Sequence, residues 1–146
     1  MKVVRPGLFT TLVLVGCGPI VMVPGGELSG TTTPVPADWA FSDAVETVQL
    51  ETRPDDPYSV NVWGVSDGAD FWIACADATS AWCRNIEVDP RVRLRIDDAL
   101  YELSAAAVND DASRARVLAL LQEKYDFEPA PDEVDGAILF RLRPRS

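Results

Sequence analysis

Three arginines, Arg91, Arg93 and Arg95, alternate with apolar residues, and this pattern could bind an anion. Residues two apart on a strand share one face, so the three guanidinium groups would line up over about 13 Å. Guanidinium groups bind phosphate and carboxylate through charge-assisted hydrogen bonds. The alternative, which we favour, is a solvated face paired with some of the 23 acidic residues. Arg141 and Arg143 share a face of a later predicted strand and could extend this arginine stripe.

Several kinds of chemistry are excluded by what the chain lacks. It contains no histidine, which excludes histidine-based catalytic triads and zinc sites built on imidazole. It also has no glycine-rich dinucleotide loop and no Walker motif. An enzyme built from this sequence would therefore take its chemistry from a cofactor. The net charge of −10 repels nucleic acid, so we expect no nucleic-acid partner.

The run Leu14-Val15-Gly16-Cys17 resembles the lipobox that ends a bacterial lipoprotein signal peptide. It follows a basic start with Lys2 and Arg5 and an apolar stretch over residues 7–15. Glycine and proline interrupt the apolar run, whereas a membrane span needs about 20 apolar residues. The resemblance implies that residues 1–16 are removed and that acylated Cys17 anchors the protein in membrane lipid, facing the periplasm or the exterior. A plain signal peptide cleaved elsewhere is the alternative.

The implied lipidation of Cys17 leaves two further cysteines, Cys75 and Cys83. Disulfides persist in the oxidising space outside the membrane, so the implied export favours a disulfide between these two residues. Two cysteines are too few for a cysteine-rich metal site, and we expect no bound metal.

The composition changes near residue 38. Residues 17–37 are rich in glycine, proline and threonine and predict a flexible tether, whereas residues 38–146 predict one domain. Helical spacing predicts a helix over about 80–87 and a second one that follows Asn109-Asp110-Asp111 and extends to Tyr125, with an irregular acidic loop after it. Six strands and two helices favour a mainly β fold, an antiparallel barrel with appended helices. The strands are predicted from alternating apolar residues near 48–51, 60–63, 71–75, 92–96, 100–108 and 138–142.

The stretch from Ser80 to Asp97 resembles the Trp-x-x-Asn and Pro-x-Val signature of flavin-binding split barrels, with Asp89 and Pro90 in matching places. These proteins form the pyridoxamine 5′-phosphate oxidase superfamily, and the chain resembles in particular its deazaflavin-dependent nitroreductase branch. The resemblance implies a six-stranded antiparallel split β-barrel, usually a homodimer, that holds FMN or a deazaflavin at the edge of the subunit interface. The candidate cofactor-binding residues are Arg53, Trp82, Asn85, Arg91 and Arg93.

The hairpin before the second strand departs from that branch. Its members carry a Gly-Arg-x-Ser-Gly type hairpin that holds the cofactor phosphate, whereas this chain has Thr52-Arg53-Pro54-Asp55-Asp56-Pro57-Tyr58. Arg53 remains as a phosphate partner, but both glycines are missing, and Asp55 and Asp56 would repel a phosphate. We therefore expect the fold to be kept and the cofactor to be lost.

Trp82 and Asn85 also have a structural interpretation, which we favour. A tryptophan on a short helix beside barrel strands commonly fills the core, and an asparagine near the end of such a helix commonly caps it. Trp63 and Trp72 either line a ligand pocket together or pack beneath the segment around residues 39–41.

The function favoured by the sequence alone is an envelope lipoprotein whose split-barrel domain is a ligand-binding or structural module. The first alternative is a flavin- or deazaflavin-dependent oxidoreductase that resembles the nitroreductases. A subunit of a larger envelope complex is the third interpretation.

Overall fold

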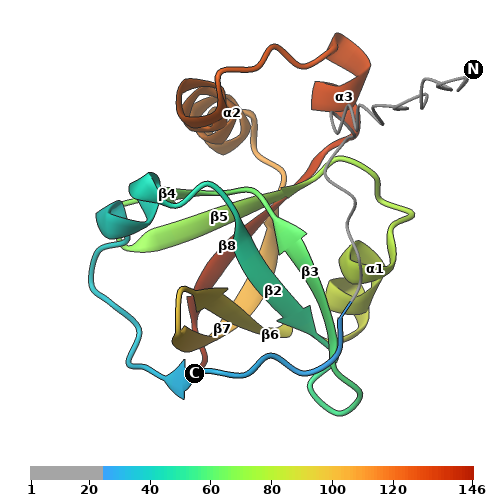
Figure 1. Ribbon diagram of the computed structural model, residues 1–146. Helices are drawn as coiled ribbons and strands as arrows, with labels where there is room; N and C mark the ends of the chain where they lie inside the picture. The colour runs from blue at the N-terminus through green and yellow to red at the C-terminus, as the bar shows by residue number, and fades with distance from the viewer. Residues whose placement is uncertain (1–24) are drawn as a thin grey trace, which may run out of the picture.

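The computed structural model describes residues 25–146, which form a strongly curled antiparallel sheet with helices around it (Figure 1). The predicted signal segment and Cys17 lie outside the described residues. Over residues 25–146 no helix has the length and apolar character needed to cross a membrane. The strands are β1 (Thr31–Thr32), β2 (Val48–Thr52), β3 (Tyr58–Val62), β4 (Gly64–Asp67), β5 (Asp70–Cys75), β6 (Arg91–Ile96), β7 (Ala99–Val108) and β8 (Ile138–Pro144).

The sheet order is β3-β2-β6-β7-β8-β5-β4, and the short β1 pairs in parallel with β7. The mainly β split-barrel class is therefore confirmed, with β1 and β4 in addition to the six predicted strands. The helices are the 3₁₀-helix η1 (Ala40–Ala44), α1 (Ala81–Val88), α2 (Asp111–Tyr125) and α3 (Pro131–Gly136). The prediction of only two helices is wrong, because α3 lies in the expected irregular loop. This short helix begins where the Ala130 amide donates to the Glu133 carboxylate at 2.9 Å.

The two ends of the sheet are consecutive in the chain and are separated by Trp63 alone. Val62, the last residue of β3, pairs with β2, whereas Gly64, the first residue of β4, pairs with Ile73 of β5. One bent strand therefore joins both ends of the sheet and closes the barrel. The sequence predicted a single strand at 60–63, because its alternating pattern does not reveal the change of partner at Trp63.

The bend at Gly64 is held from both sides. A Cβ atom added at this glycine would collide with the ring of Phe71. From α2, Lys124 Nζ donates to the Gly64 carbonyl at 2.8 Å, and Tyr125 Oη accepts from the Gly64 amide at 3.0 Å. The end of α2 thus fixes the position at which the strand changes partners.

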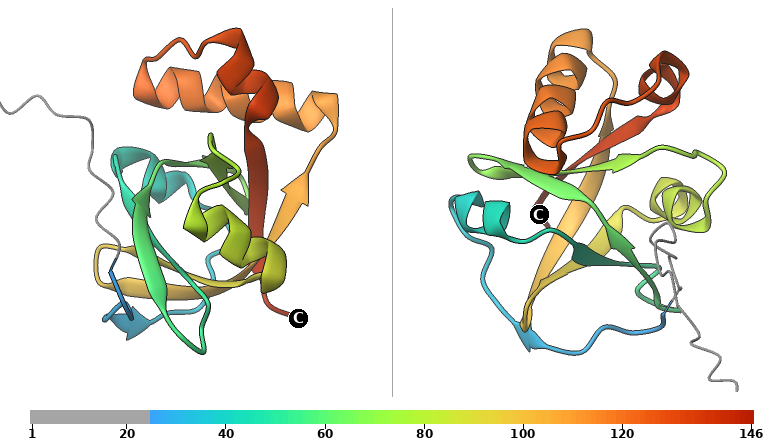
Figure 2. Two further views of the ribbon diagram at one scale, coloured as in Figure 1. Left: turned by 90° about the vertical axis from the view of Figure 1, so that its right-hand side faces the viewer. Right: turned by 45° about the horizontal axis from the view of Figure 1, so that its top comes forward.

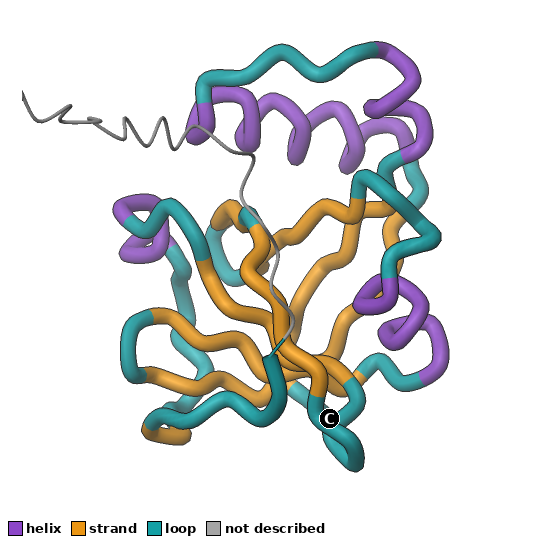
Figure 3. Tube along the Cα trace, turned by 45° about the vertical axis from the view of Figure 1, so that its right-hand side comes forward, coloured by secondary structure: helices purple, strands orange, loops and turns teal. Residues whose placement is uncertain are grey.

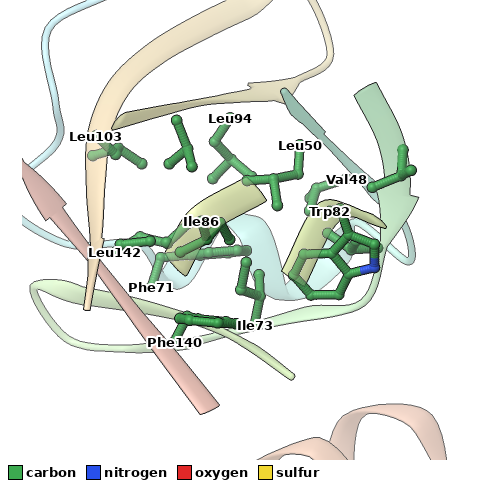
Figure 4. Close-up of a cluster of buried hydrophobic side chains, with 14 of the residues drawn as sticks. Val48, Leu50, Phe71, Ile73, Trp82, Ile86, Leu94, Leu103, Phe140 and Leu142 are labelled. Atoms are coloured by element: carbon green, nitrogen blue, oxygen red, sulfur yellow. The ribbon is translucent and has the colours of Figure 1, made fainter. Parts of the chain in front are cut away.

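The barrel interior is filled with side chains, to which α1 contributes Trp82, Cys83 and Ile86 (Figure 4). A second apolar cluster lies under α2, where Val117 and Leu121 pack against Trp72 and its neighbours. Figures 2 and 3 show α2 and α3 together at one end of the barrel, with α1 beside the strands. The helices thus cover two separate regions of the sheet.

The described part of the expected tether, residues 25–37, lies against the sheet. Gly25 forms a bridge with Ser59 of β3, and the Leu28 amide donates to the Glu51 carboxylate at 2.7 Å. Leu28 itself is buried, and the Ser29 carbonyl accepts a hydrogen bond from Arg95 at 2.9 Å. This segment therefore covers the face of β2 and β6 that carries Glu51, Arg93 and Arg95.

Candidate functional site

A cleft of about 500 Å³ opens beside the end of β5, where the chain passes from β3 to β4. Before the bend at Trp63 the chain pairs with β2, so the last residues of β5 have β8 on one side and no strand on the other. Helix α1 and the loop before it close part of this gap. The lining residues are Thr47, Asn61, Val62, Trp63, Ala74, Cys75, Ala76, Asp77, Ser80 and Trp82.

Two indole rings form the aromatic walls of the cleft. Trp63 is 38% exposed and stacks on Tyr125 of α2, with ring centroids 4.4 Å apart and planes 7° apart. Phe127 supports the same ring at a centroid distance of 5.4 Å. Trp82 is buried against Phe140, at a centroid distance of 6.2 Å. The rim at Trp63 is therefore accessible but braced, while Trp82 forms a fixed inner wall.

Among residues 25–146, the cleft lining carries one ionisable acid, Asp77, and no lysine or arginine. The Thr79 hydroxyl and amide both donate to Asp77 Oδ1, at 2.6 and 2.8 Å, and these hydrogen bonds lower the pKa of Asp77. Arg84 of α1 donates two hydrogen bonds to the Thr79 carbonyl, at 2.7 and 3.0 Å. The backbone thus orients the Arg84 guanidinium, whose positive charge also lowers the pKa of Asp77 from just outside the lining.

The predicted disulfide between Cys75 and Cys83 is present, with 6.4 Å between the two Cα atoms. It joins the end of β5 to α1 across the loop that carries Asp77 and Ser80. Ser80 Oγ adds a hydrogen bond to Cys83 Sγ at 2.9 Å. Because Cys75 also lines the cleft, the disulfide fixes one of its walls.

Of the five predicted cofactor-binding residues, the structure places only Trp82 in the cleft lining. Asn85 does not cap α1 through its side chain, because its Nδ2 donates to Thr52 Oγ1 at 3.0 Å. Thr52 is fully buried at the end of β2. Asn85 therefore ties the helix to the sheet instead of capping it, and Trp82 fills the core, as the structural interpretation expected, in addition to lining the cleft.

Arg53 and Arg91 lie around the β2–β3 hairpin, where aspartates already bind them. Arg53 has a φ of 55° and contacts Asp56 at 3.4 Å. Arg91 contacts Asp89 at 2.7 Å and Asp55 at 3.3 Å. Arg91 donates side-chain hydrogen bonds to the Asp89 carboxylate, which raise the pKa of Arg91 and lower the pKa of Asp89. The hairpin thus presents neutralised arginines.

Arg93 forms a partly buried ion pair with Glu51, whose side chain is 2% exposed. Arg93 Nε and Nη2 donate to the two carboxylate oxygens at 2.8 and 2.7 Å, which raises the pKa of Arg93. With Arg91 on aspartates and Arg95 on the Ser29 carbonyl, each member of the arginine stripe has a partner within the chain. Arg143 lies level with Arg91 across β7, since both pair with Ser104, and it binds Asp70 at 2.8 Å. The acid-paired interpretation is therefore correct for Arg91 and Arg93.

Trp63 and Trp72 do not line one pocket together. Trp63 lines the cleft, whereas Trp72 is buried under α2 and its ring lies 5.8 Å from the Arg141 guanidinium. The sequence analysis missed Asn61 and Asp77. Asn61 lies two residues before Trp63, so the two side chains share one face of the strand. A polar residue beside an aromatic one on that face was the available signal that the face is solvent-accessible.

Comparison with known proteins gives a family and a fold. The profile of the F420H(2)-dependent quinone reductase family matches residues 51–128. A comparison with curated protein sequences finds no match. Among solved structures, the chain is similar to a conserved hypothetical protein from Mycobacterium tuberculosis, with a TM-score of 0.60 and 22% identity over 73% of this chain and 78% of that one.

Two further structures share the fold at low sequence identity. One is an F420-H2 dependent reductase, with a TM-score of 0.57 and 15% identity over 68% of this chain and 95% of that one. The other is the heme storage protein HutZ from Vibrio cholerae, with a TM-score of 0.56 and 20% identity over 73% of this chain and 87% of that one. The family match runs from β2 into the loop after α2 and covers more than half of the residues. The chain therefore belongs to the F420H(2)-dependent quinone reductase family.

Proposed function

We propose that this protein is a reductase that binds a deazaflavin ring in the cleft between Trp63 and Trp82 and passes electrons to a small planar acceptor such as a quinone. The observation that carries the proposal is the cleft itself, with two indole rings in its walls. Family membership supports this function better than the ligand-binding or structural module that the sequence favoured.

The lining residues fit the uncharged ring of such a cofactor. Small-molecule sites commonly have volumes of about 300–1,000 Å³, with apolar walls and a few polar groups. The exposed part of Trp63 offers a stacking surface for a planar ring, and Trp82 closes the inner wall behind it. The Asn61 amide and the Thr47 hydroxyl offer hydrogen-bond donors and acceptors for the polar edge of the ring. When bound, the reduced deazaflavin supplies a hydride to the acceptor.

The chain's own side chains in the cleft bind and orient rather than exchange protons. Asp77 is the one acid of the lining, and its lowered pKa keeps it ionised at neutral pH. No histidine exists in the sequence to act as a general acid. The described lining therefore offers no side chain that is a general acid at neutral pH.

The test is a titration of the purified protein with 5-deazariboflavin, followed by quenching of tryptophan fluorescence. We expect saturable binding, and we expect Trp63→Leu to weaken it about tenfold, a loss of about 1.4 kcal/mol. Phe41→Leu is the matched control, because Phe41 is a comparably exposed aromatic residue, 48% exposed, outside the cleft lining. The proposal fails if no saturable binding occurs up to about 100 μM, a ligand affinity near −5.5 kcal/mol.

We also propose that the protein is exported and anchored through acylated Cys17. The resemblance of residues 14–17 to a lipobox supports this placement, as does the disulfide between Cys75 and Cys83, because disulfides persist in oxidising compartments. Replacing Cys17 with serine should move the protein from the membrane fraction to the soluble fraction or leave an uncleaved precursor. A processed Cys17→Ser chain that still fractionates with membranes contradicts the proposal.

A further inference from the structure

We propose that the cleft selects an uncharged ring, so that it binds a flavin or deazaflavin without a phosphate more tightly than the same ring with one. This inference rests on the proposed function, because it concerns the same cleft. It is carried by two features of the described residues, the charge of the cleft lining and the pairing of the arginines around the β2–β3 hairpin.

The cleft lining offers an anion no positive partner. Asp77 is its only charged side chain, and two hydrogen bonds from Thr79 stabilise the ionised form. Arg84 lies on the adjacent helix outside the lining, donates two hydrogen bonds to the Thr79 carbonyl, and places its positive charge near Asp77. Within the lining itself a phosphate group therefore meets the like charge of Asp77, and the net charge of −10 adds to the repulsion.

The next cations along the sheet are also engaged. From Trp63, the five residues of β3 extend for about 16 Å to the β2–β3 hairpin. A ligand with a long anionic tail would meet Arg53 and Arg91 there. Arg53 contacts Asp56, and Arg91 contacts Asp89 and Asp55. A phosphate must displace these carboxylates from the two arginines. The displaced carboxylates would stay close enough to repel it.

Arg93 cannot substitute for the hairpin arginines. It binds both oxygens of Glu51, and the Glu51 side chain is almost fully buried. Moving Arg93 toward a ligand would leave a buried carboxylate without its cation, which is strongly unfavourable. Arg53, Arg91 and Arg93 therefore contribute little to binding an anionic tail.

The first experiment compares matched pairs of ligands on the full domain. Riboflavin is titrated against FMN, and the F420 ring with its ribityl chain but without phosphate is titrated against F420, with tryptophan fluorescence as the readout. We expect the uncharged member of each pair to bind about tenfold more tightly. We also expect the difference to shrink as sodium chloride is raised, because about 1 M salt reduces the screening length to about 3 Å.

The second experiment tests the hairpin with a charge-matched control. The double variant Asp55→Asn/Asp56→Asn removes two carboxylates that contact the hairpin arginines. Asp132→Asn/Asp135→Asn removes the same charge from exposed positions on α3, which lies at the opposite end of the molecule (Figure 1). We expect the hairpin variant to bind F420 several-fold more tightly with no change for the phosphate-free ring, and we expect the α3 variant to change neither affinity.

The outcomes separate this inference from the proposed function. If FMN or F420 binds as tightly as its uncharged partner or more tightly, the selectivity is refuted while the reductase proposal stands. If none of the four ligands binds, both are refuted. An equal gain in the two double variants would overturn the role of the hairpin, because the effect would then be one of total charge alone.

Discussion

Replacing Arg93 with methionine should destabilise the domain strongly, because the change leaves the Glu51 carboxylate buried without its cation. Arg93 donates two hydrogen bonds to Glu51 and one, at 3.2 Å, to the Leu28 carbonyl. After the substitution, the Leu28 amide remains as a donor to Glu51, at 2.7 Å. The same change would leave the stability of the domain almost unchanged if Arg93 were a solvent-exposed residue without a partner in the chain.

The magnitude follows from the burial of the two partners. Removing one member of a buried ion pair costs about 3–5 kcal/mol. The Glu51 side chain is 2% exposed, whereas that of Arg93 is 19% exposed, so water reaches part of the ion pair. We therefore expect a loss of stability at the lower end of this range, about 3 kcal/mol. For a domain of this size the loss corresponds to a fall in Tm of about 12 °C.

The assay is urea and thermal unfolding followed by circular dichroism, with a double-mutant cycle. The variant Glu51→Leu/Arg93→Met should be at least about 1 kcal/mol more stable than Arg93→Met alone, because it removes the unpaired charge. Arg95→Met is the matched control and should cost less than about 0.5 kcal/mol, since Arg95 makes one exposed hydrogen bond, to Ser29. An Arg93→Met variant within about 0.5 kcal/mol of the parent would refute the reasoning.

Three further predictions concern stability. Gly64→Ala should lower stability by about 2 kcal/mol or more in urea unfolding, because its Cβ would enter the Phe71 ring, and an unchanged midpoint would contradict this reading of the bend. Hydrogen bonds from Arg116 lower the pKa of Asp67 below its ordinary value of 3.8, so this pair stabilises the fold above pH 3.8 and loses its effect as the pH falls through the lowered pKa. Asp67→Asn should therefore cost about 0.5–1 kcal/mol at pH 6 and progressively less as the pH falls below 3.8, and a loss that does not change with pH would be inconsistent with it. Reducing the disulfide between Cys75 and Cys83 should cost about 2.5 kcal/mol in the chain-entropy model, and a Tm that does not respond to reductant would count against that estimate.

The sequence predicted those elements whose pattern depends on local spacing. Alternating apolar residues in β6 reflect a strand with one buried face, and the observed strand spans Arg91–Ile96. Asp110 caps α2 as one of three predicted candidates, since its carboxylate accepts from the Ser113 amide at 2.8 Å. The capping signal is local because a side chain a few residues away accepts the hydrogen bond from the free backbone amide at the start of the helix.

The candidate site was less predictable because its features depend on contacts between distant segments. Alternation shows that Glu51 and Arg93 point away from the barrel core, but it cannot show that residues 27–29 cover them. The two residues meet because β2 and β6 pair in register, although they are 42 positions apart in the sequence. The cleft likewise depends on the change of strand partner at Trp63, which no local pattern encodes.

The single bent strand that closes the barrel also constrains how the cleft can respond to a ligand. Because β3 and β4 are joined by one residue, the two halves of the sheet cannot separate without breaking the hydrogen bonds that α2 makes to Gly64. The opposite wall is fixed covalently by the disulfide. The opening is thus preorganised, and a ring that enters it loses little free energy to reshaping the protein. Ligand shape should then determine access, with oversized rings excluded rather than accommodated.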